Sequence, residues 1–336
     1  KQNNGRIKVI TGLRRCGKSF LLFELYRDYL ISSGVPENNI LCIPLDDVDY
    51  EEYCDPHKLH TYIKEQVNDP EQQYYVFIDE AQYAISKEEM KNPDVPIRLY
   101  GVLNSLLRKR NVDVYITGSN SKFLSSDIMT EFRGRGDEVH IAPLSFSEYF
   151  PASGLNKMDA WKEYLYYGGL PHILAEMGDE AKSNYLEKLN REIYLRDIYE
   201  RYDMREEAGM ESLMKVVASA VGSLTNPQKI SATFMSSGYK GISIPTISNY
   251  LKYLQESFVI QKAERYDIKG RKYIGTPSKY YYSDLGLRNS LLNFRQFEET
   301  HLMENAIYNE LIYRGYNVDV GVVEVRQNED GKRVRK

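Results

Sequence analysis

The sequence predicts an α/β protein, in which a parallel β-sheet with covering helices is followed by a helical segment, a smaller domain and a partial α/β tail. Three features support this prediction. Short apolar runs of strand length alternate with amphipathic helical patterns up to residue 150. A glycine-bounded loop joins the first strand to the first helix. The composition then changes at Pro151 and Gly154, and a mainly helical stretch follows.

The composition is that of an ordinary globular protein. The chain has 336 residues, of which 42% are hydrophobic and 27% are charged, and this is enough for two or three domains. No apolar run approaches the ~20 residues of a membrane span, and we expect no secretory leader. The three cysteines form no C-x-x-C pair. We therefore expect a cytoplasmic protein with no membrane partner, whose native N-terminus lies upstream of Lys1.

The loop after the first strand has the spacing of a phosphate-binding motif. Residues 12–19 read GLRRCGKS, a complete G-x-x-x-x-G-K-S between an apolar strand and a helical pattern. Backbone N–H groups of such a loop, and the helix that follows it, point positive charge at a phosphate. Lys18 is expected to reach the β- and γ-phosphates, and Ser19 to ligate Mg²⁺. A simple strand-to-helix turn is disfavoured because both flanks also fit. The predicted nucleotide-binding residues are Gly12, Arg14, Arg15, Cys16, Gly17, Lys18, Ser19 and Phe20.

Two acidic residues supply the groups that a phosphate loop needs for hydrolysis. Residues 74–82 read YYVFIDEAQ, an apolar strand that ends in Asp79 and Glu80. At the carboxyl end of a strand, Asp79 can hold Mg²⁺ and Glu80 can polarise an attacking water. The alternative is that both are helix-capping residues. The phosphate loop upstream favours the metal and water roles.

Two further catalytic candidates follow the next strand, residues 112–118. Thr117, Ser119 and Asn120 are small polar residues that could contact the γ-phosphate or the water, and Asn120 is taken as the catalytic candidate. A plain turn is nearly as good an interpretation for each. Arg135 lies between glycines before a strand, as an arginine finger at a subunit edge would. A solvated arginine in a turn is an equal alternative.

These motifs carry a family resemblance. TGLRRCGKS, YYVFIDEAQ, YITGSNS and EVHIAPLSFSEYF together resemble the AAA+-like branch of P-loop ATPases. More narrowly, they resemble a bacterial and archaeal family with a carboxyl-terminal domain of uncharacterised function. The resemblance implies an AAA+-like P-loop sheet, ATP as the nucleotide and Arg135 as the arginine before the last core strand. Nothing in the residues themselves selects adenine over guanine.

The region after residue 226 predicts a winged helix-turn-helix domain. A short helix at 230–235 precedes a helix at 246–257 that Pro245 opens, and two strands then flank a turn at Gly270. Residues 240–290 hold nine Lys/Arg and four Asp/Glu, so their local charge is 9 − 4 = +5 in a chain of net charge −4. Double-stranded DNA is therefore one expected partner, and protein docking is the alternative. The predicted nucleic-acid contacts are Thr246, Asn249, Lys252, Lys269, Arg271 and Lys272, with Tyr253 on the same helix face.

The tail predicts only part of a fold. In the family that the chain resembles, the helix with Glu304 opens a restriction-endonuclease-like domain, which needs an Asp and an E-x-K on later strands. Asp319 and Glu324 are present, but Arg326 replaces the lysine, so no cutting is predicted.

The prediction is therefore a Mg²⁺-dependent ATPase whose nucleotide state controls a winged helix. The predicted domains are an ATPase core (1–150), a helical linker or lid (151–226), a winged helix (227–290) and a truncated nuclease-like fold (291–336). A homo-oligomer is compatible with this organisation. The alternatives are a nucleotide-dependent scaffold that binds protein partners and a small-molecule P-loop kinase. The kinase is disfavoured because Glu80 supplies a water activator and no acceptor lid is evident.

Overall fold

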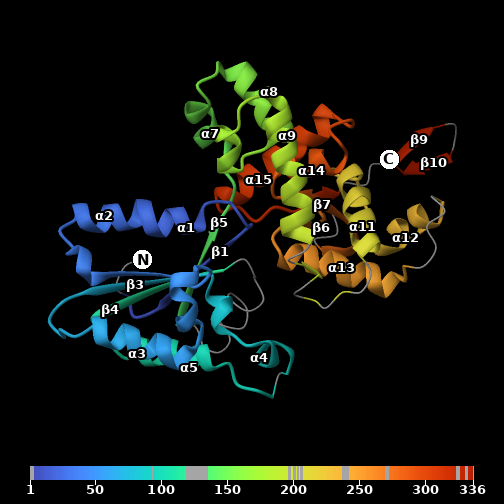
Figure 1. Cartoon of the computed structure of the whole chain (residues 1–336). Coiled ribbons are helices and arrows are strands. Elements are labelled where there is room, and N and C mark those ends of the chain that lie inside the picture. Colours follow the sequence, from blue (N-terminus) through green and yellow to red (C-terminus); the bar gives the residue numbers. More distant parts are fainter. Residues whose placement is uncertain are drawn as a thin grey trace. The chain divides into compact units, whose positions relative to one another are not determined.

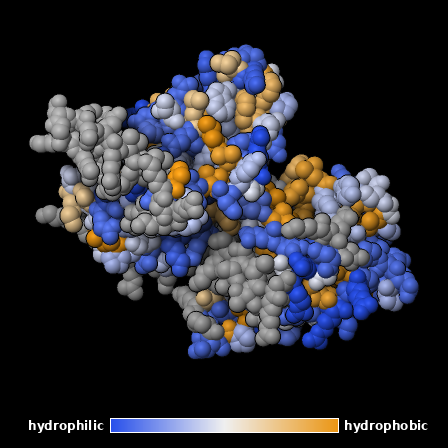
Figure 2. All heavy atoms as spheres, turned by 180° about the vertical axis from the view of Figure 1, so that it is seen from behind, coloured by the Kyte–Doolittle hydropathy of each residue, from blue (hydrophilic) through white to orange (hydrophobic). Residues whose placement is uncertain are grey.

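The computed structural model describes residues 4–92, 94–118, 135–195, 198–199, 202, 204, 207–236, 242–268, 272–322, 326–329 and 332–335. The chain divides into two compact units, Lys1–Ala142 and Pro143–Lys336. Hydrophilic side chains cover much of the face shown in Figure 2, and hydrophobic side chains form smaller groups among them. Among the described residues, no helix is both long and apolar enough to cross a bilayer.

The N-terminal unit is built on a five-stranded sheet in the order β2-β3-β4-β1-β5. All of the strand pairs are parallel, as the alternation of strands and helices predicted. The nearly continuous apolar runs of β3 and β4 are completely buried, as is typical of a parallel sheet covered on both faces. The strands are β1 (Ile7–Gly12), β2 (Ile40–Pro44), β3 (Tyr74–Asp79), β4 (Val112–Thr117) and β5 (Gly136–Ile141).

Helices lie on both faces of this sheet (Figure 1). A helical stretch that starts after the phosphate loop covers one face, and α3 and α5 cover the other. The first stretch consists of α1 (Lys18–Phe20), a π-helical part (Leu21–Tyr26) and α2 (Arg27–Ser32). The others are α3 (Pro56–Gln66), α4 (Lys87–Lys91) and α5 (Arg98–Leu107), and short 3₁₀ turns occupy Glu37–Asn39, Val48–Cys54 and Ala81–Ala84.

One ion pair is buried within the apolar sheet. The Lys8 ammonium on β1 donates to the Asp113 carboxylate on the neighbouring strand β4, and both side chains are almost fully buried. Tyr115 donates to the other Asp113 oxygen at 3.0 Å, and its hydroxyl also contacts that of Tyr26 at 2.7 Å. Removing one partner of such a pair would leave an uncompensated buried charge. The pair therefore fixes β1, which leads directly into the phosphate loop, beside β4.

The C-terminal unit is mainly helical, with two small sheets (Figure 1). Strands β6 and β7 form an antiparallel hairpin, and β8 pairs parallel with β6. The helices are α7 (Phe146–Ser153), α8 (Lys157–Tyr167), α9 (Asp179–Lys188), α11 (Glu207–Ser219), α12 (Pro227–Ser236), α13 (Ile244–Glu256), α14 (Leu285–Leu291) and α15 (Glu299–Tyr313). Pro171–Ala175 is a 3₁₀ turn and Leu189–Leu195 is π-helical. The strands are β6 (Ile260–Asp267), β7 (Lys272–Tyr282), β8 (Val320–Val322), β9 (Arg326–Glu329) and β10 (Lys332–Arg335).

Helix α14 lies at the centre of this unit, and all 7 of its residues are buried. Asp284 caps it by accepting from Leu287 N at 3.0 Å, and its other oxygen accepts from Gly169 N at 2.7 Å. Gly168 adopts φ +79°, and a Cβ atom at this position would collide with the Asp284 carboxylate. Burial raises the pKa of Asp284 to about 6, although the backbone N–H donors act to lower it. The Asp284 carboxylate therefore links the Gly-Gly turn after α8 to the N-terminus of α14 by hydrogen bonds.

The predicted helix, helix and hairpin after residue 226 are present as α12, α13, β6 and β7. Both strands are longer than the sequence pattern indicated. The tail prediction receives no support from the described residues. Glu304 on α15 accepts from Lys279 Nζ and Tyr281 OH, each at 2.6 Å, and Asp319 accepts from Tyr273 OH at 2.9 Å. Glu324 lies outside the described residues, and no cluster of three possible metal ligands occurs within them.

Candidate nucleotide-binding site

The phosphate loop begins where β1 ends, and its shape depends on its two glycines. Gly12 adopts φ +142°, and a Cβ atom there would collide with the Ile141 carbonyl on β5. Gly17 adopts φ +101° immediately before α1. Between them Arg15, a non-glycine residue, also has a positive φ of 66°. Backbone conformations of this kind are costly for side-chain-bearing residues and are found more often at functional sites than elsewhere.

Lys18 folds back on this loop. Its ammonium donates to the carbonyls of Gly12 at 3.2 Å and Leu13 at 3.1 Å, and the side chain is buried. Cys16 lies under the loop, where its thiol donates to the Ile141 carbonyl at 3.3 Å. Burial raises the pKa of Cys16, so the thiol stays protonated. Its role is to fill the space under the loop.

A small cavity opens beside the loop. Its volume is about 270 Å³, close to the lower end of the range for ligand pockets. Six predicted nucleotide-binding residues line it together with the predicted water activator. The lining residues are Arg14, Arg15, Gly17, Lys18, Ser19, Phe20, Asp46 and Glu80. The other two predicted residues do not line the cavity. Gly12 accepts a hydrogen bond from Lys18, and Cys16 packs under the loop.

The acidic pair lies where β3 ends, and Thr117 at the end of β4 connects its two members. The Thr117 hydroxyl donates to the Asp79 carboxylate and accepts from Glu80 N at 3.1 Å. Because β3 and β4 are parallel neighbours, their carboxyl ends meet at the same edge of the sheet. Asp79 is buried, whereas the backbone of Glu80 turns into the left-handed region at φ 49°.

The Glu80 carboxylate is half-buried and lies near charged groups. Burial raises the pKa of Glu80, while the Lys18 ammonium and the hydrogen bond from Gln82 act to lower it. The Gln82 amide nitrogen donates to one Glu80 oxygen. The Gln82 amide oxygen is buried and has no hydrogen-bond donor among the residues that the structure describes.

Two residues at this edge were not predicted from the sequence as site residues. Asp46 lines the cavity, and its carboxylate has no hydrogen-bond partner in the described part of the chain. Gln82 orients Glu80. The sequence carried no separate signal for Asp46, because its place at the site follows from the pairing of β2 with β3, whose register aligns Pro44 with Asp79.

Arg135 lies at the amino end of β5, whereas the phosphate loop of the same chain lies at the carboxyl ends of the strands. Arg135 immediately precedes β5, whose Gly136 pairs with Ile7 and whose Ile141 pairs with Gly12. Six residues of strand separate Arg135 from the loop end, roughly 20 Å at ~3.3 Å per residue. Its guanidinium contacts Asn104 at 3.4 Å. Asn120 and Ser119 lie outside the described residues.

The predicted nucleic-acid contacts on α13 occupy its outer side. Asn249 and Lys252 are exposed, and Thr246 is half-buried with its hydroxyl bonded to Ser243 at 2.7 Å. Lys252 lies 3.7 Å from Glu256. The Lys272 backbone begins β7, but its side chain is outside the description, as are Lys269 and Arg271.

Tyr253 on α13 has an aromatic partner. Its ring stacks on Tyr202 with centroids 3.7 Å apart, and the Tyr202 hydroxyl donates to Glu256 at 2.5 Å. The ring of Tyr253 is thus engaged by an aromatic partner from a distant part of the chain, and its contact with a nucleic acid stays a prediction.

Comparisons with known proteins agree with the loop and sheet geometry. Residues 4–150 match a family described as an AAA domain, and residues 158–298 match a domain of unknown function (DUF8612). An uncharacterized protein of Haemophilus influenzae is 35% identical over 327 residues, which are 96% of this chain and 78% of that protein. An uncharacterized protein of Methanocaldococcus jannaschii is 27% identical over 327 residues, covering 93% of this chain and 67% of its own length.

A solved structure shows the same fold. The Walker-type ATPase of Pyrococcus abyssi matches 85% of this chain and 91% of its own, with a TM-score of 0.56 and 15% identity. At that identity the likeness concerns the fold alone. The relative from Haemophilus influenzae, together with the matched domain and the phosphate loop, decides the family. The chain belongs to the same family as that protein, a family of P-loop ATPases with an amino-terminal AAA domain.

Proposed function

We propose that this protein is a Mg²⁺-dependent ATPase whose nucleotide state controls its carboxyl-terminal module. One observation carries the ATPase part. A single cavity at the carboxyl edge of the sheet is lined both by the loop residues Lys18 and Ser19 and by the acid Glu80. A cavity of about 270 Å³ is suited to the phosphates rather than to the whole nucleotide. Adenine is assigned through the family and not through a contact.

The lysine changes partners when phosphate arrives. In the structure Lys18 is bonded to two loop carbonyls, which are neutral acceptors. Phosphate oxygens are charged acceptors, with which an ammonium forms stronger hydrogen bonds. Arg14 and Arg15 line the same cavity and add positive charge at its rim. Binding the triphosphate therefore uses charge that the loop already holds in place.

The residues present fit a magnesium ion. Ser19 lines the cavity, and Asp79 ends β3 directly before Glu80, which also lines it, so this end of the sheet offers a hydroxyl and a carboxylate, the hard oxygen ligands that Mg²⁺ prefers. Thr117 fixes the orientation of the Asp79 carboxylate through a hydrogen bond. When bound, Mg²⁺ would neutralise charge that develops on the phosphate oxygens.

Glu80 acts as the water activator in this proposal. Its hydrogen bond from Gln82 and its anchored backbone N–H hold the carboxylate beside the cavity. It accepts a proton from the attacking water as the oxygen forms its bond to the γ-phosphorus and the bond to ADP breaks. A second polar group from Asn120 remains part of the proposal. Arg135 would act on the nucleotide of a neighbouring copy, because it lies at the amino ends of the strands, away from the phosphate loop of its own chain.

The deciding experiment measures γ-phosphate release for the parent and for Glu80→Gln, each with and without duplex DNA. Glu80→Gln should retain ATP binding and lose at least about 100-fold in turnover, because the amide cannot accept the proton. Release that needs no Mg²⁺, or that survives this substitution, would exclude the mechanism. Phosphate transfer to an added metabolite without net hydrolysis would favour the kinase alternative.

Duplex DNA is the partner proposed for the carboxyl-terminal module. The helix-helix-hairpin order, the exposed Asn249 and Lys252 and the local charge of 9 − 4 = +5 over residues 240–290 support this assignment. The triple substitution of Lys269, Arg271 and Lys272 by Glu should abolish DNA affinity at low salt. Lys215→Glu, on α11 and outside residues 240–290, is a single-site charge control and should change the DNA affinity little.

Each outcome assigns the module differently. DNA-stimulated release that Glu80→Gln abolishes supports a coupled ATPase acting on nucleic acid. Release that is indifferent to DNA leaves the ATPase assignment and moves the module to a protein partner. Nucleotide binding without any release favours a nucleotide-dependent scaffold.

A further inference from the structure

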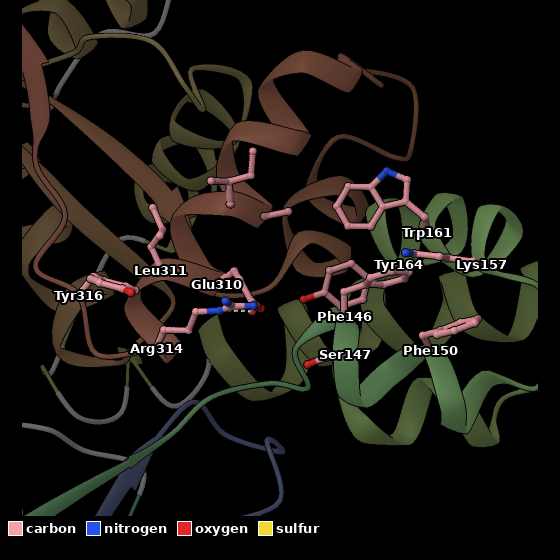
Figure 3. A pocket seen from close by; sticks show the side chains of 12 residues that line it. Phe146, Ser147, Phe150, Lys157, Trp161, Tyr164, Glu310, Leu311, Arg314 and Tyr316 are labelled. Atoms are coloured by element: carbon pink, nitrogen blue, oxygen red, sulfur yellow. Dashed lines mark hydrogen bonds and ion pairs between the residues drawn. The ribbon is translucent and has the colours of Figure 1, made fainter.

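A second, larger cavity lies wholly within the C-terminal unit (Figure 3). Its volume is about 730 Å³, in the range for one drug-sized molecule. Helices α7 and α8 form one wall, and α15 with the residues that follow it forms the other. No residue of the phosphate loop or the acidic pair takes part. The nucleotide-binding site therefore does not explain this cavity.

One wall is an array of four aromatic rings. Phe146 meets Trp161 edge-on with centroids 4.9 Å apart, and it stacks on Phe150 at 5.9 Å. Tyr164 lies 5.6 Å from Phe146, and its hydroxyl donates to the Leu144 carbonyl at 3.1 Å. Because these rings pack on one another and the tyrosine is tied to the backbone, the wall is a preformed apolar surface. Such a surface favours an aromatic or aliphatic body.

The opposite wall is mixed. Leu311 and the exposed Ile307 present apolar side chains from α15. The Arg314 guanidinium donates through two nitrogens to one Glu310 oxygen, and the Nε and Nη2 distances are both 2.7 Å. Figure 3 shows this pair facing the aromatic wall. The charge of Arg314 is thus already compensated within the protein.

Lys157 is the uncompensated charge of the cavity. The lining ions Lys157, Arg314 and Glu310 sum to +1 + 1 − 1 = +1. In the part of the chain that the structure describes, no carboxylate lies within ion-pair distance of Lys157. Lys157 is also the first residue of α8, where a cation opposes the helix dipole. Lys157 is exposed, so its ammonium is accessible to a ligand.

We propose that this cavity binds a small organic anion, with an apolar body against the aromatic wall and a carboxylate or similar group at Lys157. The volume favours a small molecule over a protein surface, which would need about 800 Å² on each side. The proposal does not depend on nucleotide hydrolysis, because none of the residues is shared.

The test uses the intrinsic fluorescence of Trp161, which is the only tryptophan in the sequence. Dodecanoate, kept below its micellar concentration, is titrated into the full chain, and dodecyltrimethylammonium serves as the probe of opposite charge. A saturable change in emission is expected with dodecanoate, at a concentration at least tenfold lower than with the cation. No saturable change, or equal responses to both probes, would overturn the proposal.

Two lysines on α8 provide a matched pair of variants. Lys157→Glu should weaken dodecanoate binding at least tenfold and favour the cationic probe. Lys162→Glu should change neither, because Lys162 is on the same helix but lines a different cavity. Equal losses in both variants would mean a general charge effect and would contradict the assignment. If Lys157→Glu does not fold, Lys157→Gln with calorimetric titration of dodecanoate decides the question, and unchanged affinity would reject the role of Lys157.

Discussion

Asp79 in the N-terminal unit and Asp284 in the C-terminal unit are both nearly buried carboxylates, with 3% and 2% of their surfaces exposed. Asp284 accepts backbone N–H groups on both oxygens, so the chain itself satisfies it. Asp79 accepts from the Thr117 hydroxyl on one oxygen, and its other oxygen has no partner among the described residues. Glu80, its neighbour, lines a cavity. Burial does not distinguish a structural carboxylate from a functional one, whereas the identity of its partners does.

The largest expected effect is a loss of nucleotide affinity in the N-terminal unit. Lys18→Ala should weaken ATP binding by at least about 100-fold, ~2.8 kcal/mol, because the buried ammonium is the loop's charge for phosphate. Fluorescent-nucleotide titration measures the affinity, and Lys58→Ala, at an exposed lysine of α3, is the control. An equal loss in both variants would remove the lysine from the site.

The second prediction concerns the structural carboxylate. Gly168→Ala should lower the free energy of unfolding by ~2 kcal/mol, since it adds both left-handed strain and a collision with Asp284. Gly154→Ala, at φ +68° with no atom near the new Cβ, should cost only the strain, ~1 kcal/mol. Urea denaturation compares the two. Equal costs would show that Asp284 does not need the close approach of Gly168.

The third prediction tests the threonine that connects the acidic pair. Thr117→Val should lower turnover by about tenfold, because Asp79 and Glu80 N both lose a hydrogen-bond partner worth ~1–3 kcal/mol. Thr117→Ser keeps the hydroxyl and should retain most of the activity. Steady-state phosphate release provides the measurement, and similar rates for the two variants would assign Thr117 to packing.

The smallest expected effect concerns the unpredicted acid. Asp46→Asn should raise the Mg²⁺ concentration for half-maximal nucleotide binding by about threefold, because it removes one negative charge from a partly solvated cavity. Asp47→Asn is its matched control, since Asp47 caps the next turn by accepting from Asp49 N at 3.0 Å. If Asp47→Asn raises this Mg²⁺ concentration equally, the effect is one of general charge and Asp46 does not act at the site.

Local sequence patterns were sufficient for much of the N-terminal unit. The parallel sheet, the glycine-bounded loop and the acidic strand end follow from spacing and apolar runs, and the structure confirms these elements. Strand ends in a parallel sheet converge, so Lys18 and Glu80 could be placed together before any coordinates were known.

Features that depend on register or on distant partners could not be predicted in this way. Arg135 is far from its own loop because of the pairing between β5 and β1, which no motif specifies. The Tyr253 stack needs Tyr202, fifty-one residues earlier (253 − 202). Asp46 and Gln82 carry no motif of their own, and their roles appear only when neighbouring strands or turns are placed.

The fastening of Gly169 to Asp284 has a consequence for synthesis on the ribosome. The two residues are 115 positions apart, and at about 5–20 residues per second translation needs roughly 6–23 s to pass from one to the other. Until α14 emerges, the turn after α8 lacks its fastening and the aromatic faces of α7 and α8 lack their covering helices. The nascent chain therefore exposes apolar surface for many seconds, a state that is prone to aggregation.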